Sequence, residues 1–273
     1  MTFTRAELLT AVERSPRLVA VHDRAGWVAL YTPEAQIEDP VGSRPHRGLD
    51  QIDRFYSTFI APRDITFHLR TDVVVDDTVI RDVDLEVRMG VGVTMHIPAV
   101  LRYDLAAVGG EVKIARLQAF WELPGMVGQF LRSGPRALPA GGALSVALLR
   151  NQGLGGAAGF LSGLVGAGTV GKRHVERFLG DAGAGDEVAV RRRLGRTRVT
   201  VGESHPLSGA DLLGMLADVR CDKLIAGGPH VVAAIEAPNG DRGVLIFDLE
   251  TRPLTITRLR VFAAPGLTGS DRG

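Results

Sequence analysis

Cysteine, aromatic side chains and net charge are all scarce in this chain. Cys221 is the single cysteine among 273 residues, so no internal disulfide can form and nothing requires an oxidising compartment. Lys and Arg total 32 against 31 for Asp and Glu, a formal net charge of +1. Because phosphate binding needs clustered, unneutralised cations, nucleic acid is not an expected partner. The composition indicates a cytoplasmic protein.

Motifs for metals and nucleotides are missing as well. The seven histidines are scattered without the spacing of a zinc site. The segment Gly166–Arg173, GAGTVGKR, imitates a phosphate-binding loop, but such a loop follows a buried strand, and here a glycine-rich stretch precedes it. We therefore expect neither a metal nor a cofactor.

No long apolar run predicts a membrane span or a signal peptide. The uncharged stretch 151–171 approaches the length of a span, but its eight glycines weaken both helicity and hydrophobicity. Met1–Ser15 has mixed charge and lacks the apolar core of a signal peptide. We expect no integral membrane association.

What the chain does contain predicts two folded domains. Hydrophobic residues make up 45% and charged residues 23%, a normal balance for a folded core, and the length suits two domains. The boundaries expected are a first domain at 1–125, a Gly/Ala/Leu-rich linker with short helices at 126–171, a second domain at 172–265 and a disordered tail at 266–273.

The first domain reads as helices followed by strands, the order of an α+β fold. Helical spacing covers Arg5–Tyr31, with a break expected at Ser15–Pro16, and a short strand is expected at Gln36–Asp39. A second helix is expected at Leu49–Ile60, and from Ile65 onward the hydrophobic period changes to two, as in antiparallel strands.

The second domain repeats this order, which indicates a tandem duplication. HRGLDQIDRF (His46–Phe55) is similar to LSGADLLGML (Leu207–Leu216), and KIARLQAF (Lys113–Phe120) is similar to TITRLRVF (Thr255–Phe262). Each domain is then expected to be a cone-shaped unit, a curved and mostly antiparallel sheet wrapped around helices. An intramolecular pseudo-dimer or a homodimer would fit this duplication.

Asp39 is the candidate for chemistry. Side chains alternate along a strand, so Asp39 shares the inward face with Ala35 and Ile37, while Glu38 points to solvent. A carboxylate in an apolar pocket loses solvation, so its pKa rises towards the range useful for a general base. The alternative is that Asp39 only bonds backbone amides of the following turn.

The segment YTPEAQIEDPVGSRPHRGLDQIDRFY (Tyr31–Tyr56) resembles the core of the ketosteroid isomerase family, within the superfamily of nuclear transport factor 2 and the SnoaL-like cyclases. AVLRYDL and LQAFW resemble its last two strands. The resemblance implies that Asp39 shuttles a proton between carbon atoms of a ketone. It also implies two donors for the developing enolate, at positions that here are Ser15 and Ala99, neither of which matches the family.

Tyr56 and Trp121 keep the family pattern, and Tyr56 or Tyr31 is the expected substitute donor. We therefore predict Asp39 and Tyr56 as catalytic. The residues expected to bind substrate are Tyr31, Phe55, Phe59, Met95, Ala99, Leu101 and Trp121.

Three functions follow from this pattern. The first is an isomerase-like enzyme for a hydrophobic polycyclic ketone of steroid or polyketide type. The second is a non-catalytic carrier or sensor of a hydrophobic molecule, and the third is a scaffold whose pocket has collapsed. In the second domain the position of Asp39 falls near Thr200 or Val201, so no base is expected there.

Overall fold

A computed structural model describes residues 3–89, 93–132, 142, 150, 166–264 and 267. The chain divides into two compact units, Met1–Asp72 with Asp77–Leu164 and Val73–Asp76 with Val165–Gly273. Each contains one six-stranded sheet and its own helices. Most of the expected linker 126–171, with its expected helices near 143–150, lies outside the described residues, as does the tail 266–273 apart from Leu267.

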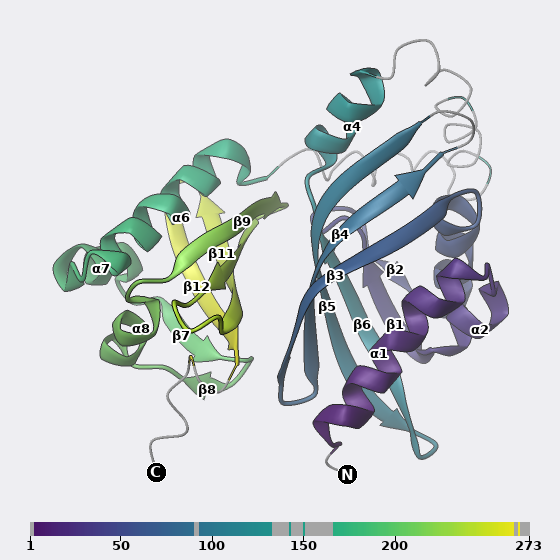
Figure 1. The fold of residues 1–273 in the computed structure, drawn as a ribbon, viewed down its shortest axis with the longest axis horizontal. Coiled ribbons are helices and arrows are strands. Elements are labelled where there is room, and N and C mark those ends of the chain that lie inside the picture. The colour runs from purple at the N-terminus through teal and green to yellow at the C-terminus, as the bar shows by residue number, and fades with distance from the viewer. Residues whose placement is uncertain are drawn as a thin grey trace. The chain divides into compact units, whose positions relative to one another are not determined.

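The first unit begins with two helices, and helix α4 follows the last strand of its sheet (Figure 1). Its elements are α1 Arg5–Ala20, α2 Arg24–Ala29, β1 Tyr31–Glu38, β2 His46–Arg47, α3 Leu49–Phe55, the π-helical turn η1 Tyr56–Ile60, β3 Asp64–Val75, β4 Thr78–Arg88, β5 Thr94–Val108, β6 Glu111–Phe120 and α4 Leu123–Arg132.

Helix α1 runs straight through Pro16, which corrects the break expected there. A capping box between Thr4 and Glu7 starts the helix, and its buried stripe includes Leu8, Val12 and Val19. Proline removes one backbone donor but keeps a helical φ, and packing of this stripe holds the helix together. The break lies instead after Ala20, before Asp23 caps α2.

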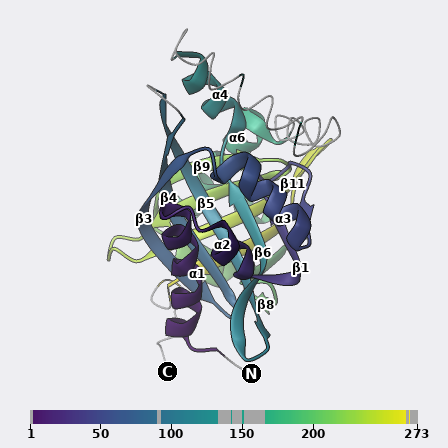
Figure 2. The same cartoon turned by 90° about the vertical axis from the view of Figure 1, so that its right-hand side faces the viewer.

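The first sheet has the order β2-β1-β6-β5-β4-β3. Strand β1 pairs parallel with β6, whereas the pairs from β6 to β4 are antiparallel. The period-two pattern expected from Ile65 onward begins with one long strand, β3, and the helix expected at 49–60 changes to π-helical geometry at Tyr56. Helices α1, α2 and α3 lie against one face of this sheet (Figure 2).

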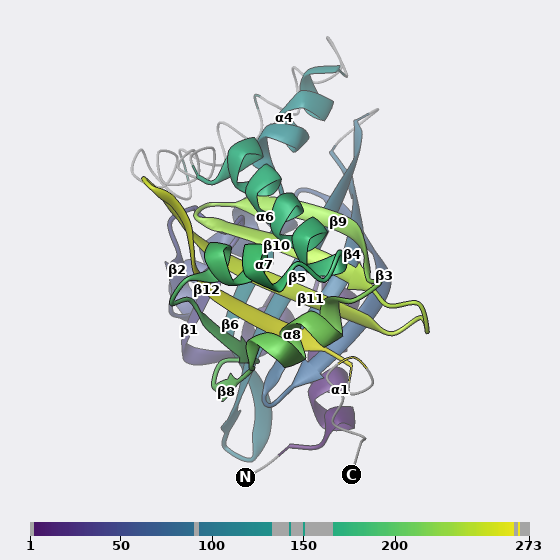
Figure 3. The same cartoon turned by 90° about the vertical axis from the view of Figure 1, so that its left-hand side faces the viewer.

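The second unit repeats the topology. Its elements are α6 Gly168–Gly183, α7 Glu187–Leu194, β7 Arg198–Val201, β8 His205–Pro206, α8 Gly209–Leu216, β9 Arg220–Gly227, β10 His230–Glu236, β11 Arg242–Thr251 and β12 Leu254–Ala263. The sheet order β8-β7-β12-β11-β10-β9 matches the first sheet strand for strand, and the helices cover one face (Figure 3).

The α+β class and the repeat expected from the sequence are therefore confirmed. Strand β9 was not anticipated, since its half towards Arg220 is polar and carries little period-two signal. Within the described part of the chain, no helix is both long and apolar enough to cross a bilayer.

Candidate functional site

The first unit encloses an apolar cavity of about 240 Å³ between its helices and the inner face of its sheet. Aliphatic, aromatic and methionine side chains from α1, η1, β3, β4, β5, β6 and α4 make up most of the wall. Among the described lining residues, the hydroxyl-bearing or charged ones are Ser15, Asp39, Arg63 and Tyr103. These four groups determine which chemistry the cavity can support.

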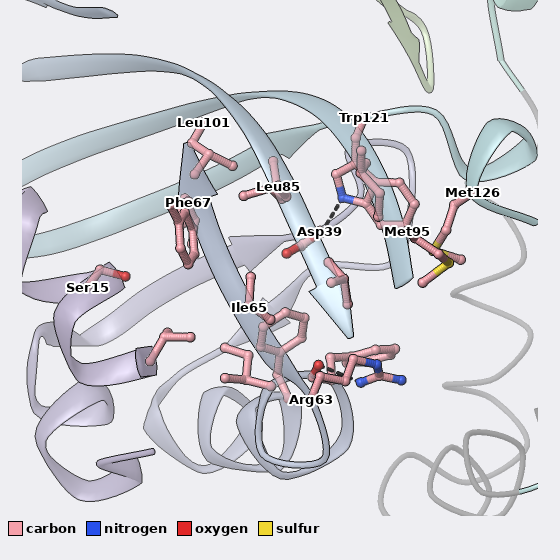
Figure 4. Close-up of a pocket in the computed structure, with 18 of the residues that line it drawn as sticks. Ser15, Asp39, Arg63, Ile65, Phe67, Leu85, Met95, Leu101, Trp121 and Met126 are labelled. Carbon is pink, nitrogen blue, oxygen red and sulfur yellow. Dashed lines mark hydrogen bonds between the residues drawn. The ribbon is translucent and has the colours of Figure 1, made fainter. Parts of the chain in front are cut away.

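Asp39 stands at the end of β1, where the parallel pairing with β6 brings it beside Trp121. Glu38 pairs with Gln118, and the Val41 amide donates to the Ala119 carbonyl at 2.9 Å, so the chain after β1 follows the end of β6. The indole Nε1 of Trp121 donates to Oδ1 of Asp39 at 2.6 Å (Figure 4). The Asp39 side chain is thereby held at the cavity wall.

The environment of Asp39 suits a base. Burial raises the pKa of Asp39 to about 6, while the hydrogen bond from Trp121 and the charge of Arg63 oppose the rise. At neutral pH the carboxylate is therefore mostly ionised, yet far more basic than an exposed aspartate. Glu38 instead accepts hydrogen bonds from the Gly42 amide and the Gln118 amide, both at 2.9 Å.

Tyr103 is a buried hydroxyl donor at the same cavity. Burial is the main cause that raises its pKa to about 12, so the phenol stays protonated, and the Ser15 hydroxyl limits the rise. Nε1 of Trp27 donates to Oγ of Ser15 at 3.0 Å. Because an indole only donates, the Ser15 hydroxyl proton can point to Tyr103, whose own proton is left for a ligand.

Arg63 follows η1 and is 9% exposed. Its Nη1 donates to the carbonyl oxygens of Thr58 at 3.0 Å and Phe59 at 2.5 Å, and its guanidinium lies 5.9 Å from the centre of the Phe59 ring. Burial lowers the pKa of Arg63 to about 10, and the Asp39 charge counteracts this, so the group remains a cation at neutral pH.

Helix α4 covers part of the cavity with Met126, Val127 and Phe130. The Gln129 amide fixes it to β5, because Oε1 accepts from the His96 amide at 3.0 Å and Nε2 donates to the His96 carbonyl at 2.8 Å. Pairing of β5 with β6 begins only at Val100, so at His96 this side chain takes the place of a neighbouring strand.

The structure places most residues expected at the site around this cavity. Asp39, Phe55, Phe59, Met95, Leu101 and Trp121 line it, as does Ser15. Three others, Tyr31, Tyr56 and Ala99, do not belong to the described lining.

Tyr56 and Tyr31, the expected substitute donors, are buried in the core and do not belong to the described cavity lining. Both rings pack on Trp27, with centroid distances of 5.3 Å for Tyr56 and 4.8 Å for Tyr31. Their hydroxyls are buried without a hydrogen-bond partner among the described residues. Ala99 is fully buried on the inward face of β5, but its side chain ends at Cβ and does not reach the cavity surface.

Sequence reasoning missed two residues of this site. Tyr103 shares the inward face of β5 with Met95 and Leu101, so strand alternation alone could have identified it. Arg63 lies between Pro62 and the start of β3, and a cation next to a proline normally reads as an exposed turn. Nothing in the local sequence indicates that this arginine is buried.

The second unit lacks the equivalent of Asp39. The aligned strands KIARLQAF and TITRLRVF make Gln118 equivalent to Arg260. Glu38 pairs with Gln118, and Thr200 pairs with Arg260 in the same parallel register. The residue after each is Asp39 in the first unit and Val201 in the second.

The partners of the base are lost there too. Trp121 follows β6, and the equivalent position after Phe262 is Ala263. Tyr103 pairs with Leu117 as Phe247 pairs with Leu259, so phenylalanine replaces the buried tyrosine. Phe247 packs on Phe178 at 5.4 Å within a core cluster of apolar side chains only. The second unit keeps the fold without the polar groups of the cavity.

The described residues contain no group of three or more His, Cys, Asp and Glu side chains placed to hold a metal ion. The polar groups of the cavity are one carboxylate, two hydroxyls and one guanidinium, which can take up, donate and orient protons without any bound group.

Comparison with known proteins gives a family match in the first unit. Residues 12–117 lie almost entirely within the first unit and match the family model described as SnoaL-like domain. A search of curated proteins gave no match.

Several solved structures are similar to about half of the chain. RV0760c from Mycobacterium tuberculosis, in complex with estradiol-17beta-hemisuccinate, is 26% identical and matches 44% of this chain and 96% of its own, with a TM-score of 0.40. The Delta 5-3-ketosteroid isomerase from Mycobacterium sp. is 24% identical over the same shares, with a TM-score of 0.40. A putative SnoaL-like polyketide cyclase from Shewanella putrefaciens is 13% identical, covers 46% of this chain and 96% of its own, and has a TM-score of 0.41.

Proposed function

We propose that the first unit is a proton-transfer enzyme that isomerises a hydrophobic polycyclic ketone, with Asp39 as the base. The observation that carries this proposal is the Asp39 carboxylate in an apolar cavity, with its pKa raised to about 6 by burial and its orientation fixed by Trp121. A base with a pKa near the working pH combines ionisation with basicity, which is the condition for efficient general base catalysis.

In the first step, Asp39 takes the proton from the carbon next to the substrate carbonyl. The C–H electron pair moves into the new C=C bond, and the carbonyl oxygen becomes an enolate oxygen. In the second step, protonated Asp39 returns the proton to a different carbon of the conjugated system. The double bond is then shifted, and the enzyme is restored to its starting state.

Tyr103 is the proposed donor to the enolate oxygen, in the role that sequence reasoning gave to Tyr56. Its high pKa keeps it neutral, so it donates a hydrogen bond without losing its proton. The Ser15 hydroxyl, which accepts from Trp27, favours the polarised form of the Tyr103 hydroxyl and so makes Tyr103 a better donor. In this proposal Ser15 acts on the substrate through Tyr103. It does not itself contact the enolate oxygen, as the resemblance implies for the tyrosine at this position in the family.

The walls of the cavity favour a flat apolar substrate. Phe55, Phe59, Met95, Leu101 and Trp121 line it, and methionine adapts to irregular ring edges. A volume of about 240 Å³ is slightly below the usual range of small-molecule sites, about 300 to 1,000 Å³, so the cavity suits a compact ligand. An open cavity also argues against the scaffold hypothesis, which expects a collapsed pocket.

The test is isomerisation of a Δ5-3-keto steroid by the intact chain, followed through the absorbance of the conjugated product. We expect turnover in the wild type and a loss of about 10³-fold or more in Asp39→Asn, which keeps an acceptor for Trp121 but has no basic oxygen. The matched control is Glu38→Gln, which removes the neighbouring carboxylate outside the cavity, and it should retain its rate.

Steroid binding to both wild type and Asp39→Asn without turnover in either would favour a carrier of hydrophobic molecules. Proton exchange from other polycyclic ketones in deuterium oxide extends the test beyond steroids. If the wild type neither exchanges nor isomerises any of them, the enzyme proposal is wrong.

A further inference from the structure

The guanidinium of Arg63 is a buried cation whose charge is not used by any ion pair among the described residues. Its five N–H groups can satisfy several acceptors, yet the described hydrogen bonds engage Nη1 alone, with the carbonyls of Thr58 and Phe59. Nε and Nη2 of Arg63 are not among the fully buried side-chain atoms that lack a hydrogen-bond partner. Arg63 lines the cavity (Figure 4), which leaves its Nε and Nη2 groups for a ligand there.

The Nε–Nη2 edge of Arg63 has a specific shape. Nε and one Nη of an arginine form a planar fork that matches the two oxygens of a carboxylate. Arg81 in the same unit shows the fork in use, because its Nε and Nη2 each donate to one carboxylate oxygen of Asp72 at 2.9 Å. Arg81 is 3% exposed and carries a second ion pair with Glu13, at 2.9 Å.

Arg63 is therefore different from a buried arginine whose role is structural pairing. Removing a cation from water costs several kcal/mol unless a counter-charge compensates. The cavity offers Asp39 as a neighbouring charge, but Asp39 is hydrogen-bonded to Trp121, and it acts on Arg63 only through space. The carbonyl oxygens of Thr58 and Phe59 hold the guanidinium of Arg63 in place. They carry only partial negative charges, so they do not compensate its full positive charge.

We propose that Arg63 binds a carboxylate of the ligand, so that the substrate class of this cavity is a hydrophobic acid with an apolar ring body. The inference deepens the proposed function and concerns the same cavity. The ring body occupies the apolar wall, the carboxylate pairs with the Nε–Nη2 edge of Arg63, and the reacting carbons lie at Asp39. A ligand carboxylate near Asp39 also makes that base stronger, because a second negative charge opposes its ionisation.

The experiment compares two probes of one shape, anthracene-2-carboxylate and its methyl ester, by fluorescence titration at pH 8. At this pH both the acid probe and Asp39 are ionised. The quantity of interest is the ratio of acid affinity to ester affinity, which cancels the contribution of the shared rings. Arg63→Gln keeps hydrogen-bond donors for Thr58 and Phe59 but removes the charge, and Arg63→Lys keeps the charge without the fork.

We expect the acid-to-ester ratio to fall about tenfold or more in Arg63→Gln, with ester affinity within about twofold of the wild type. Arg63→Lys should give an intermediate ratio. Arg17→Met, which removes a side chain that is 75% exposed, should leave the ratio unchanged and so controls for general surface charge. Thermal unfolding of each variant reports any loss of fold directly.

Two results would overturn this inference. One is an unchanged ratio in Arg63→Gln, whether or not both affinities drop together, because Arg63 would then only cap η1. The other is failure of the wild type to bind either probe. If the neutral steroid is turned over in an Asp39-dependent way but the ratio is unchanged in Arg63→Gln, the proposed function stands and only this inference fails. If the ratio depends on Arg63 but no ketone is turned over, this inference stands and the enzyme proposal is contradicted.

Discussion

Trp121 donates a hydrogen bond of 2.6 Å to Asp39, although the two residues lie 82 positions apart in the sequence. The parallel pairing of β1 with β6 makes this contact, because both strands end at the same edge of the sheet. The indole thus holds the candidate base at the cavity wall and limits the rise of its pKa.

The Trp121 contact predicts a pH dependence. The ratio kcat/KM should fall as the pH drops through about 6, since protonated Asp39 cannot act as a base. Trp121→Phe removes the hydrogen bond that lowers the pKa of Asp39, so the acid limb of the profile should move to higher pH. Initial rates between pH 4.5 and pH 9 measure both profiles, and an acid limb that stays in place would contradict the assigned contact.

Tyr103→Phe should lower kcat by about 10²–10³-fold, the typical cost of losing one oxyanion donor, with a small effect on KM. Ser15→Ala should cost less, because it weakens the Tyr103 hydroxyl without removing it. Steady-state kinetics with the same ketone measure both effects.

Tyr56→Phe is the matched control for Tyr103, because its hydroxyl is buried, lies outside the cavity lining and has no hydrogen-bond partner in the described chain. It should keep the wild-type rate and equal or exceed the wild-type stability, since an unsatisfied buried hydroxyl is a cost. A large rate loss in Tyr56→Phe, with Tyr103→Phe unaffected, would return the donor role to Tyr56.

Asp39→Asn should stabilise the fold at pH 8. The pKa of Asp39 is about 6 in the folded state and about 3.8 in the unfolded chain, so the folded state binds more protons between these values. The stability of the fold therefore falls as the pH rises towards 6, because the folded state loses a proton that it binds more tightly than the unfolded chain does. Above pH 6 the stability stays at this lower level. We expect a gain on the order of 1–3 kcal/mol at pH 8, which shrinks as the pH falls towards 4.

Chemical denaturation at pH 8 and pH 4.5 measures this gain, and Glu38→Gln serves as the control for removing a carboxylate nearby. Equal stability of wild type and Asp39→Asn at pH 8 would show that the cavity does not raise the pKa of Asp39. A stabilised but inactive variant is the usual sign of a functional group placed at the expense of stability.

Gln129→Ala should release helix α4 from β5 and increase the dissociation rate of a bound steroid. The variant loses both hydrogen bonds to the backbone of His96, and α4 carries Met126, Val127 and Phe130 of the cavity wall. Stopped-flow displacement measures the rate, for which an increase of about 5- to 30-fold corresponds to the loss of one to two kcal/mol.

Gln129→Glu is the graded control for the release of α4. It keeps an acceptor for the His96 amide but places a carboxylate against the His96 carbonyl, so it should fall between wild type and alanine. If both variants release the ligand at the wild-type rate, α4 does not gate the cavity.

The repeat of the fold could be predicted from the sequence because it depends on local patterns. Segments KIARLQAF and TITRLRVF share Ile, Arg, Leu and Phe at equivalent positions, and they form the equivalent strands β6 and β12. The break expected at Pro16 was wrong because tertiary packing, and not local propensity, decided the structure there. Local propensity disfavours proline in a helix, but burial of the stripe around Val12 and Val19 outweighs the loss of one backbone hydrogen bond.

Strand alternation by itself determined that Asp39 faces inward, because the period of a β-strand is a local property of the backbone. Only the tertiary structure decided which groups meet there. The packing of α1 against the inner face of the sheet joins Ser15 to Tyr103, the π-helical turn carries Tyr56 behind Trp27, and the loop after it buries Arg63. These are contacts between segments far apart in the chain, and their partners are set by how the layers pack, which no local pattern records.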